Sequence, residues 1–280
     1  MTDITKPLVS ICIPHWQVQE LATLCLRAIR KFSKNIPIEV IVVDNGSEDK
    51  SLDYLRGLKW IRLIERRKQD LPAFWVDAFV TALDIGFADS HGDYFIIMHT
   101  DTIVKHPGWL ERLLQPFADD PKCAASGAWK LELRSPLSEF LRKITDTKKA
   151  QLWFKRTFLG NTKARQLPRE LCPRDYCAMY RSEPIRRLGL HFDSKGRYGG
   201  YTAGEQMYYQ LKENGYHASV IDTAEMMKYM VHLAHATAGL RPKERRLGHW
   251  RAQVKAEYKL RRLFNSDLAK ELMEDTTLDR

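Results

Sequence analysis

An apolar run with charged side chains directly behind it constrains the fold of this chain more than any other stretch. Residues 94–98 read Tyr-Phe-Ile-Ile-Met, a pattern typical of a strand buried on both faces of a mostly parallel sheet. His99 and Asp101 follow at once. Ligands of open α/β sheets bind beyond the carboxyl ends of the strands, and a carboxylate there can hold a divalent cation that binds a diphosphate. A polar turn that merely closes the strand is the alternative interpretation.

The sequence on both sides repeats a strand-and-helix pattern. Short β-rich runs predict strands at 9–14, 38–43, 60–64, 124–133, 176–180 and 218–222. Apolar residues at helical spacing predict helices at 21–32, 48–57, 74–87, 107–117 and 205–214. Strands that alternate with helices indicate an α/β fold, with a doubly wound parallel sheet and right-handed crossovers.

Composition narrows the class of protein. With 280 residues and 44% hydrophobic content, the chain is long enough for one large domain with an appendage. No apolar run approaches the roughly 20 residues that span a bilayer, and the N-terminus lacks the pattern of a secretory signal. The five cysteines form no Cys-x-x-Cys pair, which suits reduced thiols. We therefore expect a cytoplasmic protein.

A formal net charge of +10 indicates an anionic partner. In residues 137–169, lysines and arginines are interleaved with phenylalanine and tryptophan, and residues 243–264 predict a long basic helix. These segments suit a solvated charged face, which is the default, or a surface that docks on anionic lipid. A nucleic-acid interface is the least favoured of the three, because no recognised nucleic-acid module occurs; we expect no such partner.

Four motifs occur in a fixed order: Val9-Ser-Ile-Cys-Ile-Pro14, Val42-Val-Asp-Asn-Gly-Ser47, Gly92-Asp-Tyr-Phe-Ile-Ile-Met-His-Thr-Asp101 and Gly204-Glu205. In this order and spacing, over roughly residues 8–235, the chain resembles the family 2 glycosyltransferases of the GT-A fold. The motifs are similar to those of the rhamnosyltransferase-like members that build bacterial polysaccharides such as O-antigen. The resemblance implies a Rossmann-like, mostly parallel central sheet flanked by helices, with a helical C-terminal extension.

The resemblance also implies a division of the chain. A GT-A domain would cover residues 1–235, with a nucleotide-sugar half at about 8–105 and an acceptor half at about 106–235. The basic aromatic segment at about 137–169 would be an insertion in the acceptor half. Residues 236–280 would form the basic helical extension.

Several residues match the positions where the family binds its nucleotide. Asp44 ends a predicted strand, where its carboxylate can accept hydrogen bonds from a nucleoside; a capping residue in a strand-to-helix turn is the alternative. Pro14 and His15 stand where the family wraps its first loop around the base, although Gln17 replaces the usual Asn. Asp84 stands where the family usually has Asn, and a solvated helix residue is the alternative for it.

A metal site is implied by His99-Thr100-Asp101, which takes the place of the family's Asp-x-Asp. Asp101 matches the metal ligand, whereas His99 replaces the first acid and could contact ribose or phosphate. A distant His is the family's further ligand, and His232 and His235 are the candidates. We expect Mn²⁺ or Mg²⁺, with Mn²⁺ better suited to imidazole. Zinc on the His-x-x-His pair, or two histidines without a metal, are the alternatives.

The family's usual Glu-Asp pair reads Glu205-Gln206 here. An inverting transfer needs a carboxylate that takes the proton of the acceptor hydroxyl, and Gln206 cannot do so. Glu205 is therefore the predicted catalytic base. An acidic residue in the first turn of a helix is also common for structural reasons.

Together these features predict a metal-dependent inverting glycosyltransferase. The donor would be a nucleotide diphosphate sugar, carrying a hexosyl or deoxyhexosyl group, and the acceptor a saccharide or a lipid-linked saccharide. We expect a role in bacterial surface polysaccharide synthesis, in the cytoplasm and peripherally on the inner face of the membrane. The alternative is a non-catalytic nucleotide-sugar-binding protein on the same fold, because His99 and Gln206 replace acids. A sugar-1-phosphate nucleotidyltransferase is disfavoured, since residues 14–17 contain no glycine for a phosphate loop.

Overall fold

The computed structural model describes residues 6–129, 131, 170–195, 197, 202–234, 236–240 and 250–280. The chain divides into two compact units, one of residues 1–131 and 172–280 and one of residues 132–171. Nearly all described residues belong to the first unit. The predicted basic aromatic insertion at 137–169 lies outside the described residues.

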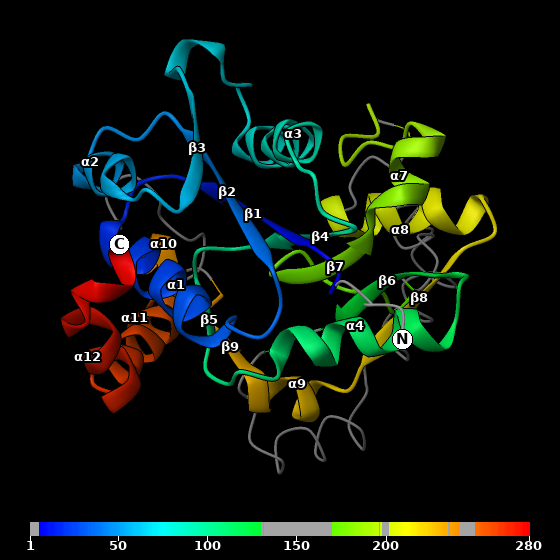
Figure 1. Ribbon diagram of the computed structural model, residues 1–280. Helices are drawn as coiled ribbons and strands as arrows, with labels where there is room; N and C mark the ends of the chain where they lie inside the picture. The colour runs from blue at the N-terminus through cyan, green and yellow to red at the C-terminus, as the bar shows by residue number, and fades with distance from the viewer. Residues whose placement is uncertain are drawn as a thin grey trace, which may run out of the picture. The chain divides into compact units, whose positions relative to one another are not determined.

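A seven-stranded sheet forms the centre of the larger unit, in the order β3-β2-β1-β4-β7-β6-β8 (Figure 1). The strands are β1 (Val9–His15), β2 (Ile38–Asn45), β3 (Ile61–Arg66), β4 (Tyr94–Met98), β6 (Cys123–Ala128), β7 (Cys177–Arg181) and β8 (His217–Ile221). The first four run parallel, and β8 is parallel to β6. Only β7 runs antiparallel to its neighbours among these strands. The predicted mostly parallel α/β fold is confirmed.

Side chains alternate along the strands, so the sheet contributes to two cores. Ile11 and Ile13 of β1 join the core under helices α1 (Gln19–Phe32) and α4 (Trp109–Asp119). Cys12, between them, joins the other core. That core is covered by α3 (Trp75–Ala88), α7 (Ser182–Leu188) and α8 (Ala203–Glu213). Helices thus cover both faces of the sheet, which explains why its strands are apolar without alternation.

The turns between strands and helices follow local chemistry. Helix α2 (Lys50–Gly57) begins after Asp49, whose side chain accepts a hydrogen bond from the backbone N–H of Ser51. A short 3₁₀ turn, η1 (Lys68–Asp70), lies between β3 and α3. Because β1 pairs parallel with β2 and β4, the carboxyl ends of the three strands lie at one edge of the sheet, and Trp75 at the start of α3 lines the cavity there.

A second, two-stranded sheet carries chain-distant segments to that edge. Strand β5 (Thr102–Val104) pairs antiparallel with β9 (Met230–His232), and Thr102 lies opposite His232. Helices α9 (Thr223–Tyr229) and α10 (Ala236–Leu240) flank β9 in the sequence.

The C-terminal extension is helical, as predicted. It contains α11 (Trp250–Phe264), α12 (Asp267–Glu274) and the 3₁₀ helix η3 (Thr276–Asp279). Figure 1 shows these elements beside α1, and the Arg27 guanidinium of α1 donates to the carbonyls of Leu272 and Met273 at 2.8 and 2.6 Å. Residues 241–249 lie outside the described residues. In the described part of the chain, no helix is both long and apolar enough to cross a membrane.

Candidate functional site

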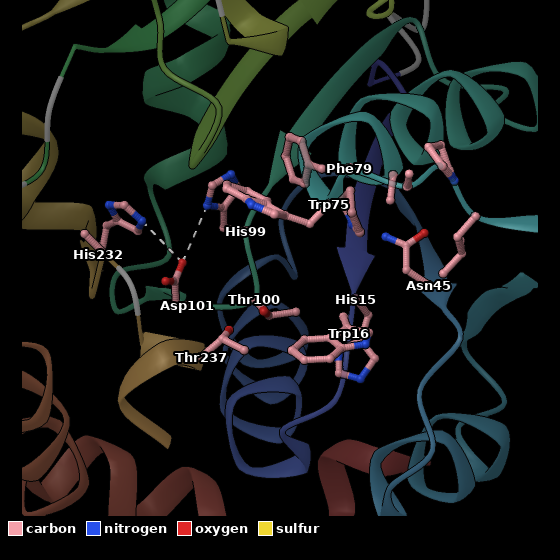
Figure 2. A pocket seen from close by; sticks show the side chains of 16 residues that line it. His15, Trp16, Asn45, Trp75, Phe79, His99, Thr100, Asp101, His232 and Thr237 are labelled. Carbon is pink, nitrogen blue, oxygen red and sulfur yellow. Dashed lines mark ion pairs between the residues drawn. The ribbon is translucent and has the colours of Figure 1, made fainter. Parts of the chain in front are cut away.

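A cavity of about 610 Å³ opens at the carboxyl ends of β1, β2 and β4 (Figure 2). Its size lies within the roughly 300–1,000 Å³ of ordinary small-molecule sites. Aromatic residues contribute much of its wall, among them Trp16 after β1 and Trp75 and Phe79 in α3. Asp101 lies on one side of the cavity and Asn45 on the other.

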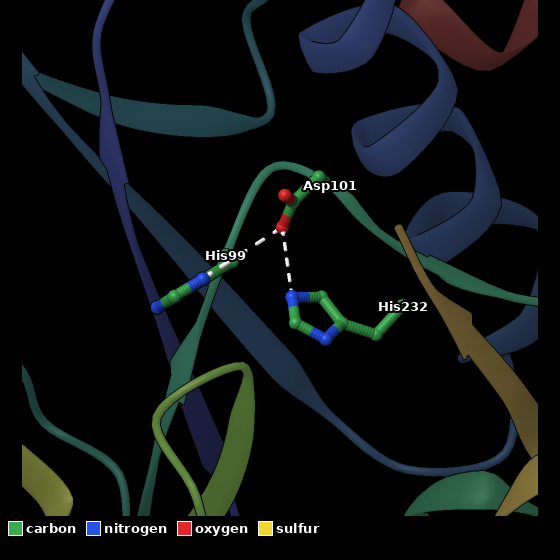
Figure 3. Close-up of side chains that lie close together, drawn as sticks. All are labelled: His99, Asp101 and His232. Atoms are coloured by element: carbon green, nitrogen blue, oxygen red, sulfur yellow. Dashed lines mark ion pairs between the residues drawn. The ribbon is translucent and has the colours of Figure 1, made fainter. Parts of the chain in front are cut away.

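Two histidines face one carboxylate oxygen on the Asp101 side (Figure 3). Nε2 of His232 lies 3.3 Å from Oδ1 of Asp101, and Nδ1 of His99 lies 3.7 Å from the same oxygen. His99, Asp101 and His232 each offer one possible ligand atom, and these three atoms lie within 4.8 Å of one another. The structure therefore brings together three residues that the sequence placed in the nucleotide-binding and metal-binding sets.

The backbone around Asp101 explains this arrangement. His99, Thr100 and Asp101 connect β4 to β5, and the pairing of β5 with β9 carries His232 to the same place. The carbonyl of Asp101 accepts a hydrogen bond from the N–H of Leu233 at 2.9 Å. Its second carboxylate oxygen, Oδ2, accepts a longer one from the N–H of Ala236, at the start of α10, at 3.4 Å.

Aromatic neighbours fix both imidazoles. Tyr176 stacks on His232, with ring centroids 4.7 Å apart and an interplanar angle of 20°. The carbonyl of Tyr176 also accepts the backbone N–H of His99 at 3.1 Å. Phe79 meets the His99 ring edge-on, at a centroid distance of 4.9 Å. Tyr176, which directly precedes β7, therefore contacts both histidines.

Asp101 is 7% exposed. Burial alone would raise the pKa of its carboxyl, but His232 and then His99 hold that pKa well below its usual value. Among the described residues, no hydrogen bond of ordinary geometry ends on Oδ1. A buried carboxylate oxygen without a donor, faced by two imidazole nitrogens, fits a divalent cation.

On the other side of the cavity, the structure places Asn45 in the wall and its neighbour Asp44 elsewhere. Successive side chains of a strand point to opposite faces, which separates the two. Both carboxylate oxygens of Asp44 accept hydrogen bonds from Ser47, from the backbone N–H at 2.9 Å and from Oγ at 2.5 Å. These hydrogen bonds close the turn after β2, whereas the cap of helix α2 is Asp49. Nucleotide binding by Asp44 stays a prediction.

Pro14 and His15 line the cavity, and their contact with a nucleotide stays a prediction. The Nε2 atom of His15 lies 2.9 Å from Oγ of Ser51. Burial lowers the pKa of His15, against the opposing effect of Asp44 and Asp49. His15 is therefore a neutral imidazole at neutral pH. Its other nitrogen, Nδ1, accepts or donates no hydrogen bond within the described chain.

Asp84 is not among the described residues of the cavity wall. It lies in α3, and its carboxylate accepts the backbone N–H groups of Phe192 and Asp193 at 2.7 and 3.0 Å. Burial raises the pKa of Asp84, and the two hydrogen bonds oppose that rise. The contacts tie α3 to the segment after α7.

Glu205 is 1% exposed and also lies away from the described wall of the cavity. Its carboxylate forms an ion pair with Nη1 of Arg174 at 2.8 Å, and its Oε2 accepts the N–H of Thr202 at 2.9 Å in a capping box. The Arg174 guanidinium stacks over Trp129 at 4.8 Å. The predicted base is thus held on both oxygens, and its catalytic role stays a prediction.

The sequence model of the family described as glycosyl transferase family 2 matches residues 10–189. The chain belongs to glycosyl transferase family 2. The match spans the sheet from β1 to β7, including His99 and Asp101, and ends before α8. No curated protein sequence matches the chain.

One solved structure agrees with the family on the fold. A mannosyltransferase from Pyrobaculum calidifontis, in complex with GDP-Man and Mn²⁺, superposes with a TM-score of 0.51 at 16% identity, over 96% of this chain and 79% of that one. TarS from S. aureus gives a TM-score of 0.48 at 14% identity, over 96% of this chain and 75% of that one. A glucosyl-3-phosphoglycerate synthase from Mycobacterium tuberculosis gives 0.40 at 18% identity, over 64% and 57%. The first likeness shows the GT-A-type fold of this family 2 chain.

Sequence reasoning about this family 2 chain missed several residues that the structure brings to the site, among them Trp16, Asn45, Trp75 and Tyr176. Each lies at an end of a strand or at the start of a helix on the edge that binds ligands in open α/β sheets. Their position at this edge could have identified them from the sequence as candidates for the site. His235, the alternative to His232, lies outside the described residues.

Proposed function

We propose that the chain is a metal-dependent glycosyltransferase that takes a sugar from a nucleotide diphosphate sugar. The observation that carries the proposal is the Asp101 carboxylate, held between His99 and His232 at the end of β4 in the cavity wall. Family membership supports the reaction class, and the cavity supports a small-molecule donor.

Asp101, His99 and His232 would hold the cation, which is Mn²⁺ or Mg²⁺; whether His235 takes part is open to test. A bound cation would supply positive charge to the diphosphate leaving group. The residues of the chain bind and orient the ligands. Pro14, His15 and Asn45 would contact the nucleoside, because they line the same cavity. The mannosyltransferase from Pyrobaculum calidifontis, solved with GDP-Man and Mn²⁺, is consistent with this assignment.

The finer proposal is an inverting transfer of a hexosyl or deoxyhexosyl group to a saccharide or a lipid-linked saccharide. It rests on the family resemblance, as does the setting in bacterial surface polysaccharide synthesis. We place the donor half at about 8–105, the acceptor half at about 106–235 and the extension at 236–280. The protein would work in the cytoplasm and dock peripherally on the inner face of the membrane.

A non-catalytic nucleotide-sugar-binding protein is the second candidate. Two observations favour it. Gln206 stands in place of the acid of the family, and its Oε1 is bound by the N–H and Oγ of Ser194 at 3.0 and 2.6 Å. Glu205 is buried against Arg174. Gln206 cannot act as a base, and Glu205 would have to leave its contacts with Arg174 and Thr202 to accept a proton.

Titration with a panel of nucleotide sugars, with and without Mn²⁺, tests the proposal. We expect one donor to bind in the micromolar range or tighter with Mn²⁺ present, and to be hydrolysed or transferred slowly. Binding without any turnover would favour the binding protein. Absence of binding for every donor would overturn the proposed function.

A further inference from the structure

A second cavity, of about 670 Å³, lies at the edge of the sheet opposite to Asp101. Its wall includes Pro7, shortly before β1, and Tyr94, the first residue of β4, whereas Asp101 follows the carboxyl end of β4. The described walls of the two cavities share no residue. The volume lies within the ordinary range of small-molecule sites, so this cavity can take a ligand of its own.

Backbone contacts of the central strands hold the wall of this second cavity. Strands β4 and β7 pair with Tyr94 opposite Arg181. The N–H of Ser182 donates to the carbonyl of Asp93 at 2.9 Å, and the Asp93 carboxylate accepts the N–H of Leu8 at 2.9 Å. The segments before β1, before β4 and after β7 are thereby joined around the cavity.

Arg181, the last residue of β7, lines the cavity and is held by neutral groups. Its Nε and Nη2 atoms donate to the carbonyls of Cys123 and Phe117 at 3.3 and 3.0 Å. The guanidinium also lies over the rings of Tyr94 and Phe117, at 5.7 and 5.4 Å from their centroids. Its hydrogen-bond partners in the described chain are all neutral, so its positive charge is not compensated there.

Arg186, in α7, is held in the same way. Its Nη2 donates to the carbonyl and to Oγ of Ser90 at 2.6 and 2.9 Å, and its Nη1 donates to the carbonyl of Gly92 at 3.3 Å. The guanidinium stacks on Phe87 at 4.9 Å, and its partners within the described residues are again neutral. A guanidinium has more N–H groups than these bonds use, so Arg181 and Arg186 both keep donors for an anion.

The other polar groups of the wall fit the same interpretation. Glu183 is compensated by Arg187, whose Nε lies 2.7 Å from Oε1 of Glu183. Ser182 is 1% exposed, and its Oγ has no hydrogen-bond partner in the described part of the chain. A buried polar atom without a partner in the protein commonly marks the place of a water or an ion.

We infer that this second cavity is an anion site that takes the phosphate group of a small phosphorylated molecule. Arg181 and Arg186 would supply the charge and the N–H groups that suit phosphate oxygens, and Ser182 would add a neutral donor. The cavity lies at the edge of the sheet away from Asp101, so this ligand is distinct from the proposed donor. The inference does not depend on the proposed function.

Calorimetry with inorganic phosphate tests the inference, with a chelator present so that no cation occupies the site at Asp101. We expect the wild type to bind phosphate with a Kd of about 1 mM or tighter. Arg186→Gln should weaken binding roughly tenfold or more, because it removes a charged donor. Arg56→Gln is the matched control: Arg56 is exposed in α2 and pairs with Glu65 at 2.7 Å, and the charge change is the same.

Two further variants separate binding from folding. Ser182→Ala should weaken phosphate binding severalfold, whereas Ser126→Ala should not. Ser126 of β6 also has a buried Oγ without a partner among the described residues, but it does not line the described wall. Glu183→Gln removes a carboxylate from the wall and should tighten phosphate binding severalfold, a result that loss of folding cannot produce.

A phosphate group can come from a soluble monoester or from a lipid headgroup, and two probes distinguish these sources. Binding of glycerol phosphate that Arg186→Gln weakens would assign a soluble monoester. Flotation with phosphatidylglycerol vesicles that Arg186→Gln reduces more than Arg56→Gln does would assign a headgroup. The inference is overturned if the wild type binds no phosphate, if Arg186→Gln and Arg56→Gln change the affinity equally, or if Glu183→Gln weakens binding.

Discussion

Nε2 of His232 lies 3.3 Å from Oδ1 of Asp101, although β9 and the β4–β5 connection are far apart in the chain. Tyr176, from a third segment, stacks on the same imidazole. The site therefore forms only when β9 pairs with β5 and the residues before β7 are in place. Changes in any of these segments should affect the cavity.

Asp101→Asn is expected to weaken the binding of a nucleoside diphosphate in the presence of Mn²⁺ by roughly tenfold or more, about 1.4 kcal/mol. The amide keeps the shape of the side chain but loses the charge that favours a cation. Binding without metal should change much less. Calorimetry that finds equal affinities for the wild type and the variant at saturating Mn²⁺ would contradict the metal site.

His232→Asn should likewise reduce the affinity for Mn²⁺ alone. The chain offers a matched control in His217, whose Nε2 lies 2.7 Å from Oδ2 of Asp120 at an exposed position. His217→Asn also removes an imidazole beside a carboxylate, and it should leave Mn²⁺ binding unchanged. If both variants lose affinity equally, the cation binds elsewhere.

Glu205→Gln is expected to lower kcat by roughly 10²- to 10⁴-fold if Glu205 is the catalytic base, with donor binding retained. The ion pair with Arg174 adds a second effect, because the variant leaves a half-buried guanidinium without its carboxylate. Urea unfolding would measure that loss separately from turnover. A decrease in kcat of only a few fold would assign the base to another acid, with Asp175 and Asp193 to be tested next.

Asp84→Asn should change how stability depends on pH. Burial raises the pKa of Asp84 in the folded protein above its value in the unfolded chain. The folded state therefore holds this proton more tightly, and the free energy of unfolding decreases as pH rises through that interval. The variant lacks the titration, so its stability relative to the wild type should increase between acidic and neutral pH. If the free energies of unfolding of the two proteins change with pH in parallel, the pKa of Asp84 is not raised by burial.

Arg27→Met should destabilise the protein by about 2–4 kcal/mol, since it removes a buried guanidinium that binds two carbonyls and Asp279. Nε and Nη2 of Arg27 meet the Asp279 carboxylate at 2.8 and 2.5 Å. Arg187→Met is the control, because Arg187 pairs with Glu183 at the surface of α7 and should cost at most about 0.5 kcal/mol. Similar urea midpoints for both variants would mean that the C-terminal elements add little stability.

The basic segments should make the protein float with vesicles that contain anionic lipid. Arg261 and Arg262 of α11 are exposed, as are Val254 and Tyr258 of the same helix. Binding should weaken as salt rises, because exposed charges are screened within about 10 Å at 0.1 M ionic strength. Equal flotation with neutral and anionic vesicles would exclude an electrostatic membrane contact.

The sequence by itself determined the α/β fold, the family and the position of Asp101. Strand and helix periodicities are local, and so is the rule that the carboxyl ends of parallel strands share one edge. Asp101 and His99 could be found because they directly follow the most apolar strand. The alternative interpretation of Glu205, an acidic residue in the first turn of a helix, was also local, and the structure has Glu205 in the first turn of α8.

Only the tertiary structure decided which side chains meet. His232 reaches Asp101 through the pairing of β5 with β9, and no local pattern in residues 230–232 predicts that β5 is the partner strand. Asn45 faces the cavity while Asp44 binds Ser47, and the orientation of the Asn45 amide depends on Arg66 of the neighbouring strand. Hydrogen bonds and ion pairs between segments depend on register and burial, which arise only when the sheet is assembled.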